Sequence, residues 1–312
     1  MCAALSAAAG LGTSPRLTAA AFRRDGFGLD PAFSCLIAEV EGEPVGYALY
    51  CRDYDTERRW RRLYLADLYV EPAGRARGIG RALMAAVARA GQAEGARALM
   101  WGLLSSNLRA RRFYASIGEE VGDRIATWIG GEAFRGLATA IPPADRLALR
   151  TAVAADCPLL ARLLLALSDE IGVSPPSDAD DRLRADGFGA NPAFTAVIAE
   201  RAREPVGYAL FWPTYDTEES RRRGGWLSDL YVVPTARRSG VGMLLMAEVA
   251  HRTAIRGGSY LRWLVHANNA PARAFYGRFA QEWRKGFVCL CADRRFDALA
   301  ESAPHMPCPR AE

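Results

Sequence analysis

The spacing of apolar and polar residues predicts a β-hairpin near the start of the chain. Phe33–Val40 and Val45–Cys51 are rich in apolar, aromatic and β-branched residues, and Glu41-Gly42 lies between them as a turn. Leu63–Val70 reads as the next strand. Apolar residues at helical spacing, with Leu83, Met84 and Val87 on one side, then predict a helix over Gly80–Ala90.

The pattern continues with three further elements. Ala98–Leu104 is predicted to be a strand, Asn107–Ser116 a helix, and Arg124–Ile129 a strand that closes the domain. Helices interleaved with strands indicate an α/β fold.

A long internal repeat divides the chain. Asp25–Phe33 returns as Asp186–Phe194, and Asp67–Val70 returns as Asp229–Val232. A period of about 160 residues indicates duplicated domains rather than a solenoid. We therefore expect a first domain over 1–140, a second over 146–302 and a tail over 303–312, with Pro142-Pro143 in the linker.

The two copies differ at their beginnings. The second opens with a strand-like segment, Leu147–Val153, and a leucine-rich helix with Asp156 near its start. The first copy begins at Ala4, which aligns with Ala166 inside that helix. The first domain is therefore predicted to lack its N-terminal strand and most of its first helix, either because the true start lies upstream or because the domain is clipped.

Composition limits the class of protein. Half of the 312 residues are hydrophobic and 24% are charged, which is typical of a globular chain. No apolar run approaches the ~20 residues of a membrane span, and a net charge of +5 is too mild to suggest a nucleic-acid binder. The seven cysteines have no zinc-binding spacing, so we expect no metal, and reduced, buried cysteines in a cytoplasmic protein.

One motif carries chemistry. Arg75–Gly80 and its copy Arg237–Gly242 each follow a strand and open a helix. Glycines let the backbone approach a ligand, and a helix N-terminus offers unpaired N–H groups, so the segment suits a pyrophosphate. A dinucleotide fold is disfavoured, because it needs a small residue where Leu83 and Leu245 stand.

Together the motifs resemble the GNAT acetyltransferase superfamily. Asp-Leu-Tyr-Val precedes Arg-x-x-Gly-x-Gly, and Asn107 with Ala110–Tyr114, or Asn269 with Ala272–Tyr276, lies downstream. Asp-Gly-Phe-Gly and Tyr-Asp-Thr narrow the resemblance to the diamine (spermidine/spermine) and thialysine acetyltransferase branch. It implies two tandem domains, each a mixed, mostly antiparallel sheet flanked by helices.

The resemblance also implies residue roles. Tyr276 and Tyr114 match the family's general acid, and acetyl-CoA would be the cosubstrate. The residues that would hold it in the first copy are Leu68, Tyr69, Val70, Arg75, Arg77, Gly78, Ile79, Gly80, Arg81 and Asn107. Those in the second copy are Leu230, Tyr231, Val232, Arg237, Arg238, Ser239, Gly240, Val241, Gly242, Met243 and Asn269.

Direct attack by an amine sets two requirements. An amine with a pKa of ~10.4 is almost fully protonated at pH 7, so its proton must be removed. The thiolate leaves with a pKa of ~8.5, below that of tyrosine, so the tyrosine should act through a strengthening hydrogen bond.

The acceptor side departs from the branch. A glutamate that the branch places before the aspartate is Ala66 in one copy and Ser228 in the other. Asp67 and Asp229 remain as substrate residues, but adjacent strand residues are expected to face opposite sides of the sheet. Asp169 and Glu170 match a further acceptor contact, where the first copy has Ala7–Ala9.

The loops that precede Asp67 and Asp229 are rich in arginine. Arg58, Arg59, Arg61 and Arg62, and their partners at 221–223, either lie near the acceptor or form a solvated loop. The candidates for the lost carboxylate are Glu57, Glu218 and Glu219.

We therefore expect an N-acetyltransferase acting on a small-molecule primary amine, diamine-like or amino-acid-like. The two domains should form an intramolecular pseudo-dimer, with domain two the active copy and domain one impaired. The alternatives are a non-catalytic acyl-CoA-binding regulatory module, or an acetyltransferase for peptide N-termini or aminoglycosides.

Overall fold

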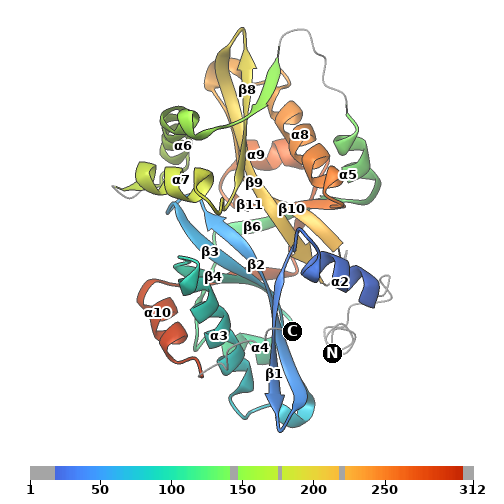
Figure 1. The fold of residues 1–312 in the computed structure, drawn as a ribbon. Coiled ribbons are helices and arrows are strands. Elements are labelled where there is room, and N and C mark those ends of the chain that lie inside the picture. The colour runs from blue at the N-terminus through green and yellow to red at the C-terminus, as the bar shows by residue number, and fades with distance from the viewer. Residues whose placement is uncertain (1–17, 141–146, 175–177, 218–221, 305–312) are drawn as a thin grey trace.

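The computed structural model describes residues 18–140, 147–174, 178–217 and 222–304, and contains two mixed sheets. Figure 1 shows them as two lobes stacked along the long axis. Below, the first half means the described residues up to 140, and the second half means those from 147 onward.

The first sheet has the order β1-β2-β3-β4-β13-β5. Its strands are β1 (Ser34–Val40), β2 (Glu43–Asp55), β3 (Trp60–Val70), β4 (Ala98–Leu104), β13 (Gly286–Ala292) and β5 (Glu119–Val121). Only β3 and β4 pair in parallel. The sheet is therefore mixed and mostly antiparallel, as the family resemblance implies.

The second sheet has the order β12-β6-β11-β10-β9-β8-β7. Its strands are β7 (Ala148–Thr151), β8 (Thr195–Arg201), β9 (Glu204–Asp216), β10 (Arg222–Val232), β11 (Tyr260–His266), β6 (Arg124–Gly130) and β12 (Gln281–Trp283). It has one strand more than the first sheet, because β7 has no counterpart among the described residues of the first half. Residues 1–17, where such a counterpart would lie, are outside the described residues, so the absence of an opening strand from the first copy stays a prediction.

The halves exchange one strand. β6, from the first half, pairs with β11 of the second sheet along its whole length, from Gly130 opposite Tyr260 to Arg124 opposite His266. β13, from the second half, pairs in the same way with β4. The prediction that Arg124–Ile129 closes the first domain's own sheet is therefore wrong. Each sheet therefore contains residues from both sides of the linker. The boundaries 1–140 and 146–302 stay a prediction about the extent of the sequence repeats.

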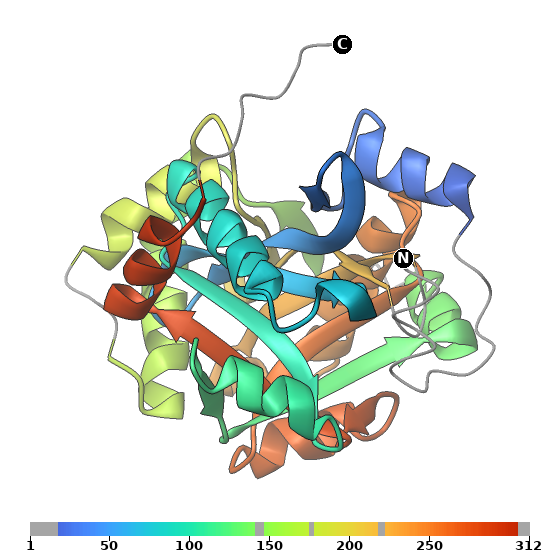
Figure 2. The ribbon, with the colours of Figure 1, turned by 90° about the horizontal axis from the view of Figure 1, so that it is seen from below.

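The helices that follow the exchanged strands change lobes with them. α5 (Gly131–Ala138) packs on α8 (Val241–Ile255), and α10 (Asp293–Glu301) packs on α3 (Ile79–Ala93). Figure 2 shows the red β13 and α10 beside the teal strands and helices of the first half. Phe134 and Phe296, fully buried on α5 and α10, each fill the core of the opposite half.

Three other helices cover the sheets near the boundary between the halves. They are α2 (Ala19–Phe27), α6 (Cys157–Ile171) and α7 (Ala179–Phe188). α4 (Leu108–Tyr114) and α9 (Ala270–Tyr276) begin after asparagines whose side chains accept a backbone N–H, from Ala110 at 3.0 Å and Ala272 at 3.1 Å. Single-turn 3₁₀ helices lie at Pro72–Gly74, Ala154–Asp156 and Pro234–Ala236.

Arginine–aspartate contacts also join the halves. Arg61 donates to Asp186 at 2.7 Å, and its counterpart Arg223 donates to Asp25 at 3.0 Å. The recurring Asp-Gly-Phe-Gly motif therefore supplies the acceptor of a contact between halves. Arg59, only 2% exposed, donates to Asp180 at 3.0 Å, so these arginines do not form a solvated loop.

Two smaller observations concern burial. Cys51, Cys157, Cys289 and Cys291 are buried, and no disulfide joins any described cysteine. None of the helices in the described part of the chain combines the length and apolar character that crossing a bilayer requires.

The exchange makes a testable prediction about stability. Phe296→Ala should lower the free energy of unfolding by about 3–5 kcal/mol, because it leaves a cavity in the core. Hydrogen exchange measured by mass spectrometry should show the loosening in α3 and β4 of the first half. The matched variant Phe134→Ala should loosen α8 and β11 instead. Loosening confined to each residue's own sequence half would contradict the exchange.

Candidate active site

The glycine loop of the second half precedes α8. Gly240 has φ of +87°, a left-handed conformation that side chains rarely adopt, and no atom lies within 4 Å of where its Cβ would be. The first turn of α8 receives no side-chain cap from Gly240. This helix N-terminus therefore presents backbone N–H groups to an open space.

Beside the loop, two neighbouring strands separate. β10 and β11 pair only at Gly225–Trp226 opposite Leu261–Arg262, so both diverge toward their carboxyl ends. The predicted segment Leu230–Val232 lies on the diverging part of β10. A slot between parallel strands with an open helix N-terminus beside it can hold an extended ligand that ends in phosphates.

A cavity of about 180 Å³ lies against these strands and is lined by both halves. From the second half it receives side chains of β10, β11, α9 and α6. From the first half it receives the end of β2, the turn that follows it and Arg124 of β6. The polar residues of its lining include Thr56, Glu57, Arg124, Ser228, Asp229, His266 and Tyr276.

A β-bulge shapes one wall of this cavity. The register of β10 against β9 shifts between Leu227 and Asp229, which leaves Ser228 without a partner residue. The Thr56 hydroxyl of the first half contacts both neighbours, Ser228 Oγ at 2.9 Å and Asp229 Oδ1 at 2.7 Å. The expectation that adjacent side chains face opposite sides is therefore wrong here, because the bulge interrupts the alternation.

Burial raises the pKa of Asp229 to about 6, although hydrogen bonds from Thr56 and Tyr208 favour its ionised form. The Tyr208 hydroxyl donates to Asp229 Oδ2 at 3.0 Å. Asp229 is thus a buried carboxylate that can change protonation near neutral pH.

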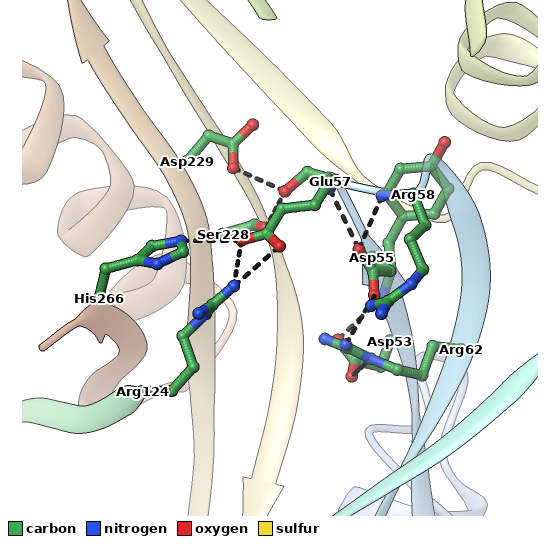
Figure 3. A network of polar contacts seen from close by, with 11 residues as sticks. Asp53, Asp55, Glu57, Arg58, Arg62, Arg124, Ser228, Asp229 and His266 are labelled. Carbon is green, nitrogen blue, oxygen red and sulfur yellow. Dashed lines mark hydrogen bonds and ion pairs between the residues drawn. The ribbon is translucent and has the colours of Figure 1, made fainter. Parts of the chain in front are cut away.

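Glu57 of the first half enters the second half's cavity (Figure 3). Arg124 donates to both carboxylate oxygens at 2.8 Å, and His266 Nε2 lies 3.1 Å from Oε1. Burial alone would raise the pKa of Glu57, but the His266 hydrogen bond and the Arg124 charge outweigh it and lower the pKa to about 2. Glu57 therefore supplies a fixed negative charge beside Ser228. Glu218 and Glu219, the other candidates, lie outside the described residues.

Tyr276 closes the cavity from α9. Its ring packs on Trp263 with centroids 4.8 Å apart and is 8% exposed. Burial and the nearby Asp229 charge raise its pKa, so the phenol stays protonated. Among the described residues its hydroxyl has no hydrogen-bond partner.

The equivalent pocket of the first half differs. It is smaller, about 80 Å³, and its lining includes Ala66, Gly102 and Leu104 but not Tyr114. Asp67 accepts hydrogen bonds from Tyr47 at 3.0 Å and Thr217 at 2.5 Å, which repeats the Asp229 arrangement. However, Leu104 and Gly286 stand where the second half's site has His266 and Arg124.

The remaining predicted residues lie as follows. Arg75 and Arg237 donate to the carbonyls of Val70 and Val232, both at 2.9 Å. Arg237 also pairs with Glu170, so Glu170 is tied to the glycine loop. Neither Glu170 nor Asp169 lines the cavity.

Sequence reasoning missed Thr56, Arg124 and His266. Arg124 lies on the exchanged strand, and Thr56 reaches the site from the other half, so no spacing along the chain connects them with Ser228. His266 ends β11, at the position where the predicted strand Ala98–Leu104 of the first copy has Leu104, and that difference is a signal visible in the sequence.

A family model described as "Acetyltransferase (GNAT) family" matches residues 6–118 and 162–280, more than half of the chain. The chain belongs to the GNAT acetyltransferase family. As a member of this family it is an acetyl-CoA-dependent N-acetyltransferase, built from two GNAT domains. The separated strands, the open N-terminus of α8 and the glycine in left-handed conformation fit the coenzyme that the family uses.

Proteins of known name or structure resemble this GNAT protein over one domain or over most of its length. Thialysine N-epsilon-acetyltransferase of Bos taurus is 36% identical over 135 residues, covering 39% of this chain and 79% of that relative. Mycothiol acetyltransferase of Clavibacter michiganensis is 29% identical over 254 residues, which cover 78% of this chain and 75% of that relative. A solved tandem GNAT protein from the clavulanic acid biosynthesis pathway has a TM-score of 0.51 at 15% identity and 93% coverage of both chains, so it shows the fold.

The low pKa of Glu57 leads to a prediction about stability. Its folded pKa lies below the ordinary value, so its contribution is complete above about pH 4.5 and is lost as pH falls toward 2. Between pH 5 and 3.5, the unfolding free energy of wild type should fall by about 1 kcal/mol more than that of Glu57→Gln. Urea denaturation at each pH measures this, with the exposed Glu132→Gln as control. Parallel curves for wild type and Glu57→Gln would contradict the pairing.

Proposed function

We propose that the second half's cavity transfers the acetyl group to a primary amine of a small molecule, diamine-like or amino-acid-like, by direct attack. One observation carries this proposal: Tyr276 of α9, Asp229 of β10 and Glu57 of the other half line one cavity beside the separated strands. Acetyl-CoA, when bound, supplies the thioester that the amine attacks.

Tyr276 suits the role of general acid. Its hydroxyl is protonated, buried and uncommitted to another residue among those described. A phenol in this state can donate a hydrogen bond that strengthens as the leaving sulfur gains charge. Its counterpart Tyr114 lies outside the lining of the first pocket, which favours the second half as the catalytic copy.

Two carboxylates at the cavity, Glu57 and Asp229, support an ammonium-bearing acceptor. Glu57 places a carboxylate beside Ser228, where the thialysine and diamine branch has a glutamate in its own strand. The first half thereby replaces a charge that the second half has lost. Relatives of this chain are named for thialysine and for spermidine/spermine, and a narrow cavity of about 180 Å³ suits a slender aliphatic amine better than an aminoglycoside.

For the first half we propose coenzyme binding without efficient transfer. Gly78 has φ of +80° before α3, so its loop repeats that of the second half. Its acceptor side has Ala66, Leu104 and Gly286 in place of Ser228, His266 and Arg124, and therefore lacks their hydroxyl, imidazole and guanidinium groups. This arrangement would retain acyl-CoA but give an amine no polar path for its proton.

Tyr276→Phe should reduce kcat about 10²-fold, because it removes the general acid, and should leave coenzyme A binding intact. Release of free thiol from acetyl-CoA measures the rate against thialysine, spermidine, short diamines, an aminoglycoside and acidic peptides. The matched variant Tyr114→Phe should retain at least half of the activity. Equal losses in both variants would contradict a single catalytic copy.

Glu57→Gln should raise the KM for a diamine about 10-fold, since one ion pair of roughly 1.4 kcal/mol is lost. The KM for acetyl-CoA should not change, and it serves as the internal control. An unchanged amine KM would show that Glu57 does not attract the acceptor.

A further inference from the structure

A chain of hydroxyl groups crosses the boundary between the halves inside the second cavity. Ser228 Oγ lies 2.9 Å from Thr56 Oγ1, and Thr56 Oγ1 lies 2.7 Å from Asp229 Oδ1. Thr56 donates to the carboxylate, so the one hydrogen left for the first contact is that of Ser228. The hydroxyls therefore point in one direction, from Ser228 through Thr56 to Asp229. Figure 3 shows the Ser228 and Asp229 ends of this chain.

The bulge in β10 makes this chain possible. In a regular strand the side chains of Ser228 and Asp229 would lie on opposite faces, and one hydroxyl could not contact both. Ser228 is partly accessible from the cavity, while Asp229 is 6% exposed. An acceptor nitrogen in the cavity can thus contact Ser228 while Asp229 remains buried.

The first half provides a natural comparison. Thr217 donates to Asp67 at 2.5 Å and Tyr47 donates to it at 3.0 Å, so the inner end of the chain is repeated. The bulged residue there is Ala66, which has no hydroxyl. Among the described residues, the series of hydroxyl groups is complete only at the second half's cavity, which Tyr276 also lines.

We propose that Ser228 and Thr56 relay the acceptor's ammonium proton to Asp229. This inference rests on the proposed function and names the proton path of that same site. The N–H bond of the ammonium breaks as Ser228 Oγ takes the proton. Ser228 passes its own proton to Thr56, and Thr56 passes its own to Asp229 Oδ1. The nitrogen keeps the electron pair, the carboxylate becomes a carboxylic acid, and water takes the proton from Asp229 after each turnover.

Asp229 suits the end of this relay better than Glu57 does. Asp229 faces Tyr208 of β9, Tyr276 of α9, and Thr56 and Glu57 of the β2–β3 turn, and Glu57 is itself paired with Arg124 of β6 and His266 of β11. Burial raises the pKa of Asp229 to about 6, whereas the Arg124–His266 pair lowers that of Glu57 to about 2. Asp229 has the higher proton affinity and is still ionised at pH 7.

The expected pH dependence follows from this pKa. The relay needs ionised Asp229, so kcat/KM for an alkylamine should fall as pH drops below about 6 and stay level above it. Without the relay only free amine reacts, and log kcat/KM should rise with a slope of one toward the amine's own pKa.

The experiment compares wild type with Ser228→Ala, which reproduces the first half's arrangement. With 1,3-diaminopropane at pH 7, Ser228→Ala should lose about 10²-fold in kcat/KM and acquire the slope of one. With hydroxylamine, which is mostly unprotonated at pH 7, it should retain at least a third of the wild-type rate. A merely structural role for Ser228 would lower both rates equally and would overturn the relay.

Further variants test the middle of the chain. Thr56→Val should behave like Ser228→Ala, and Thr56→Ser, which keeps the hydroxyl, should restore the level profile. Thr217→Val breaks the corresponding contact in the first half and should match wild type. If Ser228→Ala keeps the wild-type profile while His266→Gln loses it, His266 is the base and the relay is wrong. If wild type acetylates no amine, the proposed function fails and the relay with it.

Discussion

The strand that each half gives to the other is the constraint on which this molecule depends. β4 pairs along its length with β13, and β11 pairs along its length with β6. Neither sheet is therefore complete with strands of one half alone. Backbone N–H and C=O groups at a sheet edge require partners, and here the other half supplies them. The exchanged strands also bring α5 and α10, whose Phe134 and Phe296 fill the opposite cores. The two halves consequently fold as one interdependent unit.

This exchange fixes where the functional side chains meet. β6 places Arg124 beside His266, and the turn after β2 extends Thr56 and Glu57 over the bulge in β10. The cavity of the second half therefore contains groups from four segments that lie far apart in the sequence: Thr56–Glu57, Arg124, Ser228–Asp229 and His266. Arginine–aspartate contacts, such as that between Arg61 of β3 and Asp186 of α7, also join the halves.

The duplication gave two sites, and substitutions at equivalent positions have made them different. Ser228, His266 and Arg124 on one side correspond to Ala66, Leu104 and Gly286 on the other. The two carboxylates Asp67 and Asp229 keep the same threonine and tyrosine partners. The frame of the site is thus the same in both cavities, whereas Ser228, His266 and Arg124 line the second half's cavity and not the smaller one.

The sequence by itself determined the local elements and the family. Periodicity predicts β4 and α3, and the glycine loops predict a helix N-terminus suited to phosphate, because both depend on neighbours in the chain. The repeat predicts two similar domains, because similar sequences form similar local elements. Only the tertiary structure decided which sheet receives β6 and β13, because the same strand pattern fits an edge in either half. It also decided that Ser228 and Asp229 share one hydroxyl partner, since a bulge depends on pairing with β9. The position of Glu57 has the same origin, because it reaches the second cavity across an interface that no spacing within one repeat describes.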